Sequence, residues 1–111
     1  MAKLTEKQYD VKGHSGRSYA FNIYAVGTYF TAVGGVYIFT KGTEVNDGYT
    51  HENIYIGEIS NLSQRFEDHY MMQKVLDNGG NCVCILPVLS KEERQDIVAD
   101  LLKANKTPCN D

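Results

Sequence analysis

Apolar and polar residues alternate along the first part of the chain. The apolar positions of this pattern are Tyr9, Val11, Tyr19, Phe21 and Ile23. Between the two alternating segments lie residues 13–16, with the sequence Gly-His-Ser-Gly, which is typical of a turn. Because successive side chains of a strand point to opposite faces, this spacing predicts a β-hairpin with one buried face.

Three short apolar runs follow, at residues 36–39, 54–57 and 83–87. Their β-branched and aromatic side chains predict three strands of one sheet. In the first two runs, alternation should place the aliphatic side chains on one face, namely Val36, Ile38, Ile54 and Ile56. The polar stretch over residues 41–53 contains an Asn-Asp-Gly sequence, and we therefore expect a loop there.

Two helices complete the pattern. The first should run over residues 61–77, with Asn61 as its N-cap and Asn-Gly-Gly after its end. The second should run over residues 90–104, where Ser90 begins a capping box. Apolar residues at helical spacing support both helices, namely Leu62, Phe66, Tyr70 and Leu76 in the first and Ile97, Val98, Leu101 and Leu102 in the second. The order of elements predicts an α+β domain with a small, mainly antiparallel sheet flanked by helices.

The composition fits one packed domain and narrows the range of partners. With 111 residues, 42% of them hydrophobic, residues 1–111 suit a single domain with one core. The formal net charge of −3 argues against tight, indiscriminate binding to nucleic acid. The sequence has no apolar run of membrane-spanning length and no secretory signal, so we expect no membrane association and a cytoplasmic location.

The three cysteines, Cys82, Cys84 and Cys109, lack the spacing of a metal finger. An odd number of cysteines without a secretory signal fits a reducing compartment. We therefore expect these residues to be reduced and to serve as small core side chains.

Side chains suited to phosphate chemistry are expected to converge. On neighbouring antiparallel strands Tyr37 and Tyr55 should share a face, where Gly57 leaves room for a ligand. Arg65 and His69 are four residues apart, so they should project from one side of the first helix. Arginine can hold a phosphate through two parallel hydrogen bonds, and tyrosine or histidine can move a proton. The ordinary alternative is that the tyrosines pack and that the other two side chains lie on a solvated helix face.

Short motifs also occur in a fixed order along the chain. They are Gly35-Val36-Tyr37, Tyr55-Ile56-Gly57, Asn61-Leu62, Arg65, His69, Leu101-Leu102 and Asn110. This set resembles the GIY-YIG nuclease family over residues 34–110. The resemblance implies a three-stranded antiparallel sheet flanked by helices, to which residues 1–33 add a β extension. It also implies one divalent metal, Mg²⁺ or Mn²⁺, on a helix glutamate. The functional positions that follow from it are Tyr37, Tyr55, Arg65 and His69 for catalysis and Gly57, Asn61 and Asn110 for substrate binding.

The chain departs from the family pattern at two positions. Val98 stands where the metal-binding glutamate is expected, counted back from Leu101 and from Asn110 alike. A carboxylate at position 98 would be expected to face Tyr37, whereas valine offers a hard divalent cation no ligand, and we assign no metal site. Glu58 directly follows the second motif and would put a negative charge beside a bound phosphate.

The sequence therefore favours a degenerate GIY-YIG-like domain that binds nucleic acid or a protein partner without efficient catalysis. DNA is the expected nucleic acid, and the N-terminal hairpin offers a surface for a protein partner. Two alternatives stay open. One is an active, metal-dependent endonuclease that uses a displaced acidic residue as its metal ligand, and the other is an unrelated small α+β interaction domain.

Overall fold

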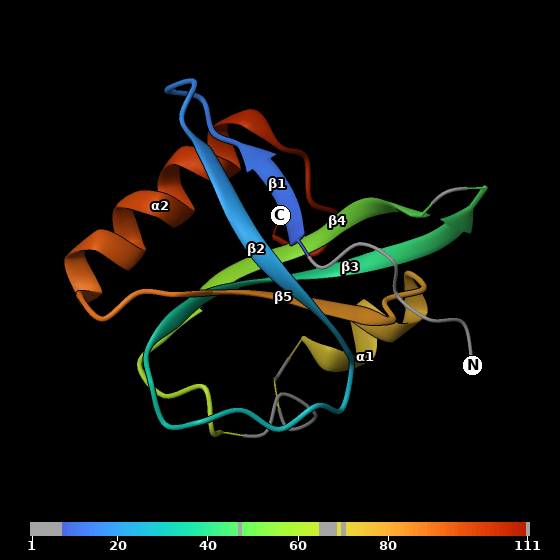
Figure 1. Ribbon diagram of the computed structural model, residues 1–111, viewed down its shortest axis with the longest axis horizontal. Helices are drawn as coiled ribbons and strands as arrows, with labels where there is room; N and C mark the ends of the chain where they lie inside the picture. The colour runs from blue at the N-terminus through green and yellow to red at the C-terminus, as the bar shows by residue number, and fades with distance from the viewer. Residues whose placement is uncertain (1–7, 47, 65–68, 70, 111) are drawn as a thin grey trace.

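The computed structural model describes residues 8–46, 48–64, 69 and 71–110. Over these residues the strands are β1 (Gln8–Lys12), β2 (Ser18–Ala25), β3 (Gly35–Val45), β4 (Gly48–Ile59) and β5 (Cys82–Pro87), and the helices are α1 (Met72–Asp77) and α2 (Lys91–Ala104). The strands form one five-stranded antiparallel sheet in the order β1-β2-β5-β3-β4 (Figure 1). The predicted α+β class, with a mainly antiparallel sheet and flanking helices, is confirmed. Neither described helix has the length and apolar run that crossing a bilayer requires.

The predicted N-terminal hairpin is confirmed as β1 and β2. Its strands pair antiparallel, with Tyr9 opposite Phe21 and Val11 opposite Tyr19. The hairpin joins the main sheet because β2 also pairs with β5, where Ile23 lies opposite Cys84. It therefore shares the core of the following strands, and its role in binding a protein partner stays a prediction.

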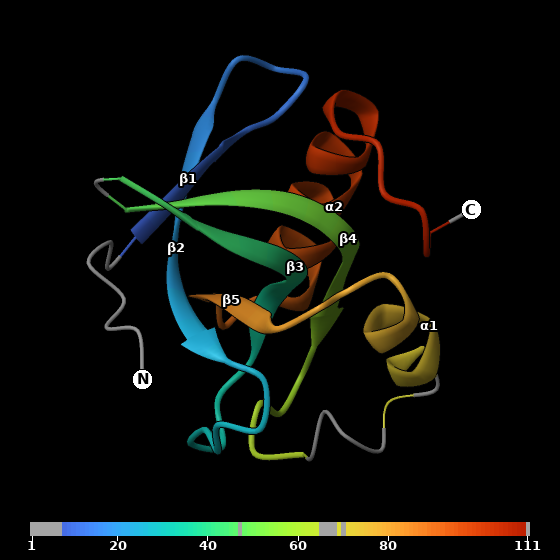
Figure 2. The same ribbon diagram turned by 90° about the vertical axis from the view of Figure 1, so that its right-hand side faces the viewer.

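The predicted loop over residues 41–53 is wrong, because β3 and β4 continue through it as a long hairpin. Lys41 lies opposite Glu52, and Thr43 lies opposite Thr50. This part of the hairpin extends beyond the core, and most of its side chains are polar and exposed. Hydrogen bonds between the two backbones therefore hold the strands together here. In Figure 2 the tip of the hairpin lies on the far side of the molecule from α1.

A β-bulge changes the face to which one predicted residue points. Phe39 pairs with Tyr55 and the next residue of β3, Thr40, pairs with Asn53, so Ile54 is the extra residue of β4. An extra residue in one strand interrupts the alternation of side chains. Ile54 accordingly packs in the cluster of Tyr37 and Phe39, and the prediction that it shares a face with the other aliphatic residues is wrong.

The predicted start of the first helix, at residue 61, is wrong. Asn61 does not cap a helix. Its side-chain oxygen accepts hydrogen bonds from the backbone N–H and the hydroxyl of Ser63, and residues 62–64 form turns and a bend. The helix α1 begins only at Met72, and residues 65–68 and 70 of the predicted helix lie outside the described residues. Its end agrees with the prediction, because Gly79 follows it with φ +83°.

The second predicted helix is confirmed as α2. The Ser90 hydroxyl accepts a hydrogen bond from the backbone N–H of Glu93, as expected for an N-cap. Ile97 and Leu101 are buried on its inner side. Burial of such side chains contributes about 1.5–3 kcal/mol each before entropy is counted, so this face holds α2 on the sheet.

The two helices pack on opposite faces of the sheet. Ile97 and Leu101 of α2 contact one cluster, which contains Val36, Ile38 and Ile56. Met72 and Val75 of α1 contact the other cluster, which contains Tyr37, Phe39, Ile54, Val83, Ile85 and Cys109. Figure 1 shows the sheet between the two helices. Because side chains alternate along β3, Tyr37 lies on the α1 side, whereas its sequence neighbours Val36 and Ile38 lie on the α2 side.

The three cysteines are reduced and buried, as predicted. Cys82 and Cys84 project to the α2 side of β5, whereas Cys109 packs on the α1 side. Burial raises the pKa of Cys84 to about 12, so its thiol stays protonated and serves as an apolar core group.

Candidate functional site

Tyr37 and Tyr55 lie on the same face of the sheet, as the sequence predicts. Their ring centroids are 6.1 Å apart with an angle of 26° between the ring planes. Tyr37 comes from β3 and Tyr55 from the neighbouring β4, where it sits opposite Phe39. The centroid of the Phe39 ring lies 5.3 Å from that of the Tyr37 ring, so the aromatic side chains form a cluster along both strands.

His69 lies in the segment that precedes α1 and packs against this aromatic cluster. Its Nε2 atom lies 2.6 Å from the hydroxyl oxygen of Tyr37. The His69 ring stands edge-on to Tyr55, with centroids 5.2 Å apart and 71° between the planes. Three of the residues expected at the site therefore converge, although 32 positions separate Tyr37 from His69. We call Tyr37, Tyr55 and His69 the aromatic site.

Backbone contacts determine which His69 nitrogen carries the proton. The N–H of Met71 donates a hydrogen bond to Nδ1 of His69 over 3.0 Å. A nitrogen that accepts a hydrogen bond has no proton, so in the neutral ring the proton is on Nε2, an assignment inferred from the hydrogen-bond network. His69 therefore donates to the Tyr37 oxygen. Burial lowers the pKa of His69 from its ordinary value of 6.5, which favours this neutral form.

We expect the stability of the fold to fall as the pH drops below 6.5, the ordinary pKa of His69. Because the folded pKa is lower, the unfolded chain binds the proton first, and acid favours unfolding between the two pKa values. Protonation would also place a proton on Nδ1 against the Met71 N–H. Urea unfolding of wild type and His69→Gln at about pH 7.5 and about pH 5.5 checks this. The wild-type midpoint should drop more than that of the variant, and equal drops would contradict the expectation.

Gly57 lies beneath the aromatic site, but Tyr37 and Tyr55 fill the space that its missing side chain leaves. A Cβ atom at this position would stand 2.6 Å from the Tyr37 hydroxyl oxygen and 3.0 Å from Cε1 of Tyr55. Tyr37 and Tyr55 therefore take up the room that we expected for a ligand at Gly57, and the assignment of Gly57 to substrate binding stays a prediction. Tyr37 is only 3% exposed, whereas Tyr55 and His69 are half-buried and therefore partly accessible.

Two residues predicted to contact substrate make hydrogen bonds within the protein through their side chains. Asn61 holds the turn with Ser63. The Asn110 amide accepts a hydrogen bond from the Ile56 N–H over 2.8 Å and donates one to the Ile56 carbonyl over 2.9 Å. Arg65, the predicted phosphate ligand, lies outside the described residues.

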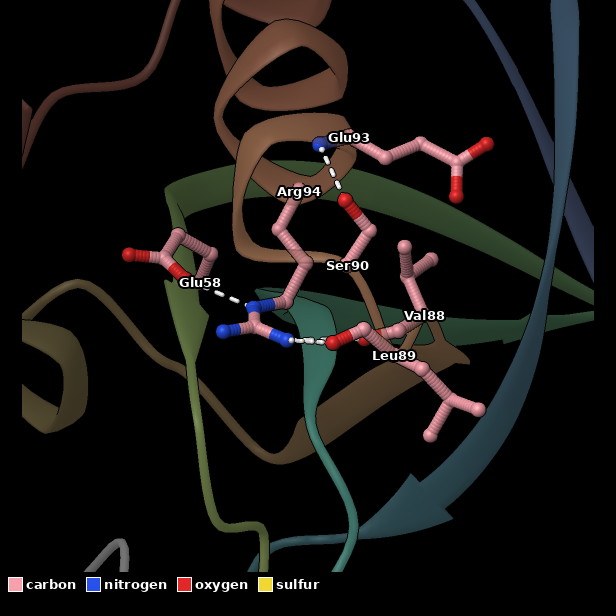
Figure 3. A network of polar contacts seen from close by, with 6 residues as sticks. All are labelled: Glu58, Val88, Leu89, Ser90, Glu93 and Arg94. Atoms are coloured by element: carbon pink, nitrogen blue, oxygen red, sulfur yellow. Dashed lines mark hydrogen bonds and ion pairs between the residues drawn. The ribbon is translucent and has the colours of Figure 1, made fainter.

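Glu58 does not lie beside the aromatic site, so the prediction of an unfavourable charge there is wrong. It projects to the α2 side, where the Nε atom of Arg94 donates a hydrogen bond to its carboxylate over 2.8 Å (Figure 3). The Nη1 atom of Arg94 also donates to the carbonyl oxygens of Val88 and Leu89. Sequence reasoning missed this buried cation, although Arg94 stands three residues before Ile97 in the apolar stripe of α2.

Val98 also lies on the α2 side of the sheet. It is half-buried and packs against the cluster that contains Val36 and Ile38. Tyr37 belongs to the cluster on the other face, so the prediction that a carboxylate at position 98 would face Tyr37 is wrong. Among the described residues, no group of three or more His, Cys, Asp and Glu side chains is arranged to hold a metal ion.

Comparison with known proteins identifies no relative, because no protein-family model, no curated protein and no solved structure matches the chain. The resemblance to the GIY-YIG family therefore rests on the motif residues alone.

Proposed function

We propose that the domain is a nuclease-like module that binds nucleic acid, with DNA as the first candidate, through the aromatic site and does not cleave it efficiently. The observation that carries this proposal is the convergence of Tyr37, Tyr55 and His69, which the order of motifs predicts and which three separate segments bring together. Because both rings are half-buried, Tyr55 and His69 are the members of the site that a ligand would touch.

The aromatic side chains of this site are suited to stacking on nucleic-acid bases. Aromatic rings stack on nucleic-acid bases of any sequence, at about 1–3 kcal/mol per base. The net charge of −3 implies modest affinity, because nucleic acid carries the same sign of charge.

Two features favour binding over cleavage. Tyr37 is the residue that the resemblance assigns to water activation, yet it is 3% exposed and its oxygen accepts the hydrogen bond from His69. A general base must come within hydrogen-bond reach of the water it activates. In addition, the valine at position 98 packs on the other face of the sheet from Tyr37.

We expect Tyr55→Leu to weaken binding of a short single-stranded DNA by about tenfold, because leucine keeps apolar bulk but removes the ring face. Fluorescence polarisation with a labelled oligonucleotide at low salt measures the dissociation constant. Tyr29→Leu is the matched control, since Tyr29 is 71% exposed and belongs to neither hydrophobic cluster. Equal effects of both substitutions, or no binding by wild type, would contradict the proposal.

A plasmid-nicking assay with Mg²⁺ or Mn²⁺ separates binding from catalysis. Wild type should leave supercoiled plasmid intact. Nicking by wild type that disappears in Tyr37→Phe would instead identify an active, metal-dependent endonuclease.

A further inference from the structure

The strand β4 lies at one end of the sheet, so its outer side is a sheet edge. The segment Asn53–Gly57 of this edge strand, Asn-Ile-Tyr-Ile-Gly, has no charged residue and has β-branched and aromatic side chains at its centre. Such an edge offers backbone N–H and C=O groups that readily pair with another strand, and natural proteins usually protect it.

In this protein the residues that follow α2 close that edge. The N–H of Cys109 donates a hydrogen bond to the Ile54 carbonyl over 3.0 Å. Two positions along β4, the side-chain amide of Asn110 bonds to both backbone groups of Ile56, accepting over 2.8 Å and donating over 2.9 Å. An amide with one acceptor and one donor side by side reproduces the pairing that a residue of a neighbouring strand would make.

We propose that Asn110 is an edge-blocking residue, which prevents β4 of one molecule from pairing with β4 of a second copy of the same chain. Identical edges fit each other, because two copies related by a twofold axis pair antiparallel over the same residues. The blocked position coincides with the uncharged segment of β4. On one side of this segment the exposed Glu52 carries a charge that discourages pairing, whereas Glu58 on the other side is ion-paired with Arg94. This role is independent of the proposed binding to nucleic acid.

The test compares two asparagines of the same C-terminal segment. Asn110→Ala removes both hydrogen bonds to Ile56. Asn105→Ala is the control for a general loss of stability in this segment. The Asn105 amide donates to the Lys12 and Leu101 carbonyls and reaches β4 through a 3.5 Å contact with the Asn53 side chain, so its removal leaves the hydrogen bonds to the Ile56 backbone in place. Hydrogen exchange followed by NMR reports the Ile56 amide, and analytical ultracentrifugation over a wide range of protein concentration reports self-association.

In dilute Asn110→Ala, where the monomer predominates, the Ile56 amide should exchange about fivefold faster than in wild type. As the concentration rises, the apparent mass should move toward that of a dimer, while Asn105→Ala stays monomeric. Asn110→Asp should lose the donor and yet stay monomeric, because its charge lies on the edge. If Asn110→Ala does not fold, Asn110→Ser takes its place, since the hydroxyl can still contact one of the Ile56 groups.

Two outcomes would overturn the proposal. A folded Asn110→Ala that exchanges faster at Ile56 but stays monomeric at every concentration would show that the amide stabilises β4 without preventing association. Dimers of Asn105→Ala as abundant as those of Asn110→Ala would show that association follows from any loss of stability in this segment.

Discussion

Replacing Arg94 by methionine should lower the free energy of unfolding by about 2–3 kcal/mol. Arg94 is 4% exposed and makes three hydrogen bonds, to the Glu58 carboxylate and to the carbonyls of Val88 and Leu89. Methionine fills a similar volume but leaves a carboxylate and two carbonyls without their donor. The Glu58 side chain is 26% exposed and can regain water, which brings the loss to or below the lower limit of the range of about 3–5 kcal/mol for a broken buried pair.

The position of Arg94 also explains Gly34, the glycine that directly precedes β3. A Cβ atom at Gly34 would lie within van der Waals overlap of Nη1 of Arg94, so only glycine leaves space for the guanidinium. The arginine thereby joins α2 to the start of β3, to the end of β4 and to the segment after β5 (Figure 3).

Urea unfolding followed by circular dichroism measures the effect of Arg94→Met. Lys91→Met serves as the control, because Lys91 is exposed on the first turn of the same helix and its replacement should change stability by less than about 0.5 kcal/mol. Glu58→Gln, which keeps an acceptor oxygen, should cost less than Arg94→Met. A loss for Arg94→Met no larger than that of the Lys91 control would show that the ion pair contributes nothing to the fold.

Replacing Gly57 by alanine should lower the free energy of unfolding by about 1–2 kcal/mol and disturb the aromatic site. The new Cβ atom would stand 2.6 Å from the Tyr37 hydroxyl oxygen and 2.7 Å from Cζ. Because Tyr37 is 3% exposed, its ring has no open space to enter, and the hydrogen bond to His69 should break. Alanine is favoured over glycine inside a strand, and this preference offsets part of the loss.

A double-mutant cycle with Tyr37→Leu tests the cause of this loss. Leucine lacks the ring atoms of Tyr37 that the new Cβ would meet. Gly57→Ala should therefore cost clearly less in the Tyr37→Leu background, where only the 3.0 Å contact with Cε1 of Tyr55 is left. Thermal and urea unfolding of wild type, the two single variants and the double variant give the coupling energy. Additive effects would mean that the contact with Tyr37 is unimportant and that the loss has another cause, such as the contact with Tyr55.

The sequence by itself determined the elements whose local pattern is strong. The alternation around Val11 and Phe21 predicts the first hairpin, and the capping box at Ser90 with its apolar stripe predicts α2. Alternation also predicts that Tyr37 and Tyr55 lie on one face. Tyr37 is opposite Gly57 and Tyr55 is two residues before Gly57, so the extra residue of the bulge does not come between them. In each case neighbours in sequence supply the information.

Only the tertiary structure decided which distant groups meet and which face each residue occupies. The polar part of the β3–β4 hairpin shows no apolar pattern in the sequence. It is held by the pairing of the two backbones, which leaves no signal in the choice of side chains. The bulge moves Ile54 to the α1 side, and the curl of the sheet carries Glu58 to Arg94, which lies 36 positions away in sequence. Asn110 reaches Ile56 across 54 positions. Such contacts depend on how a strand twists and how a helix docks, and a shift of one residue in register reverses the face of every side chain that follows.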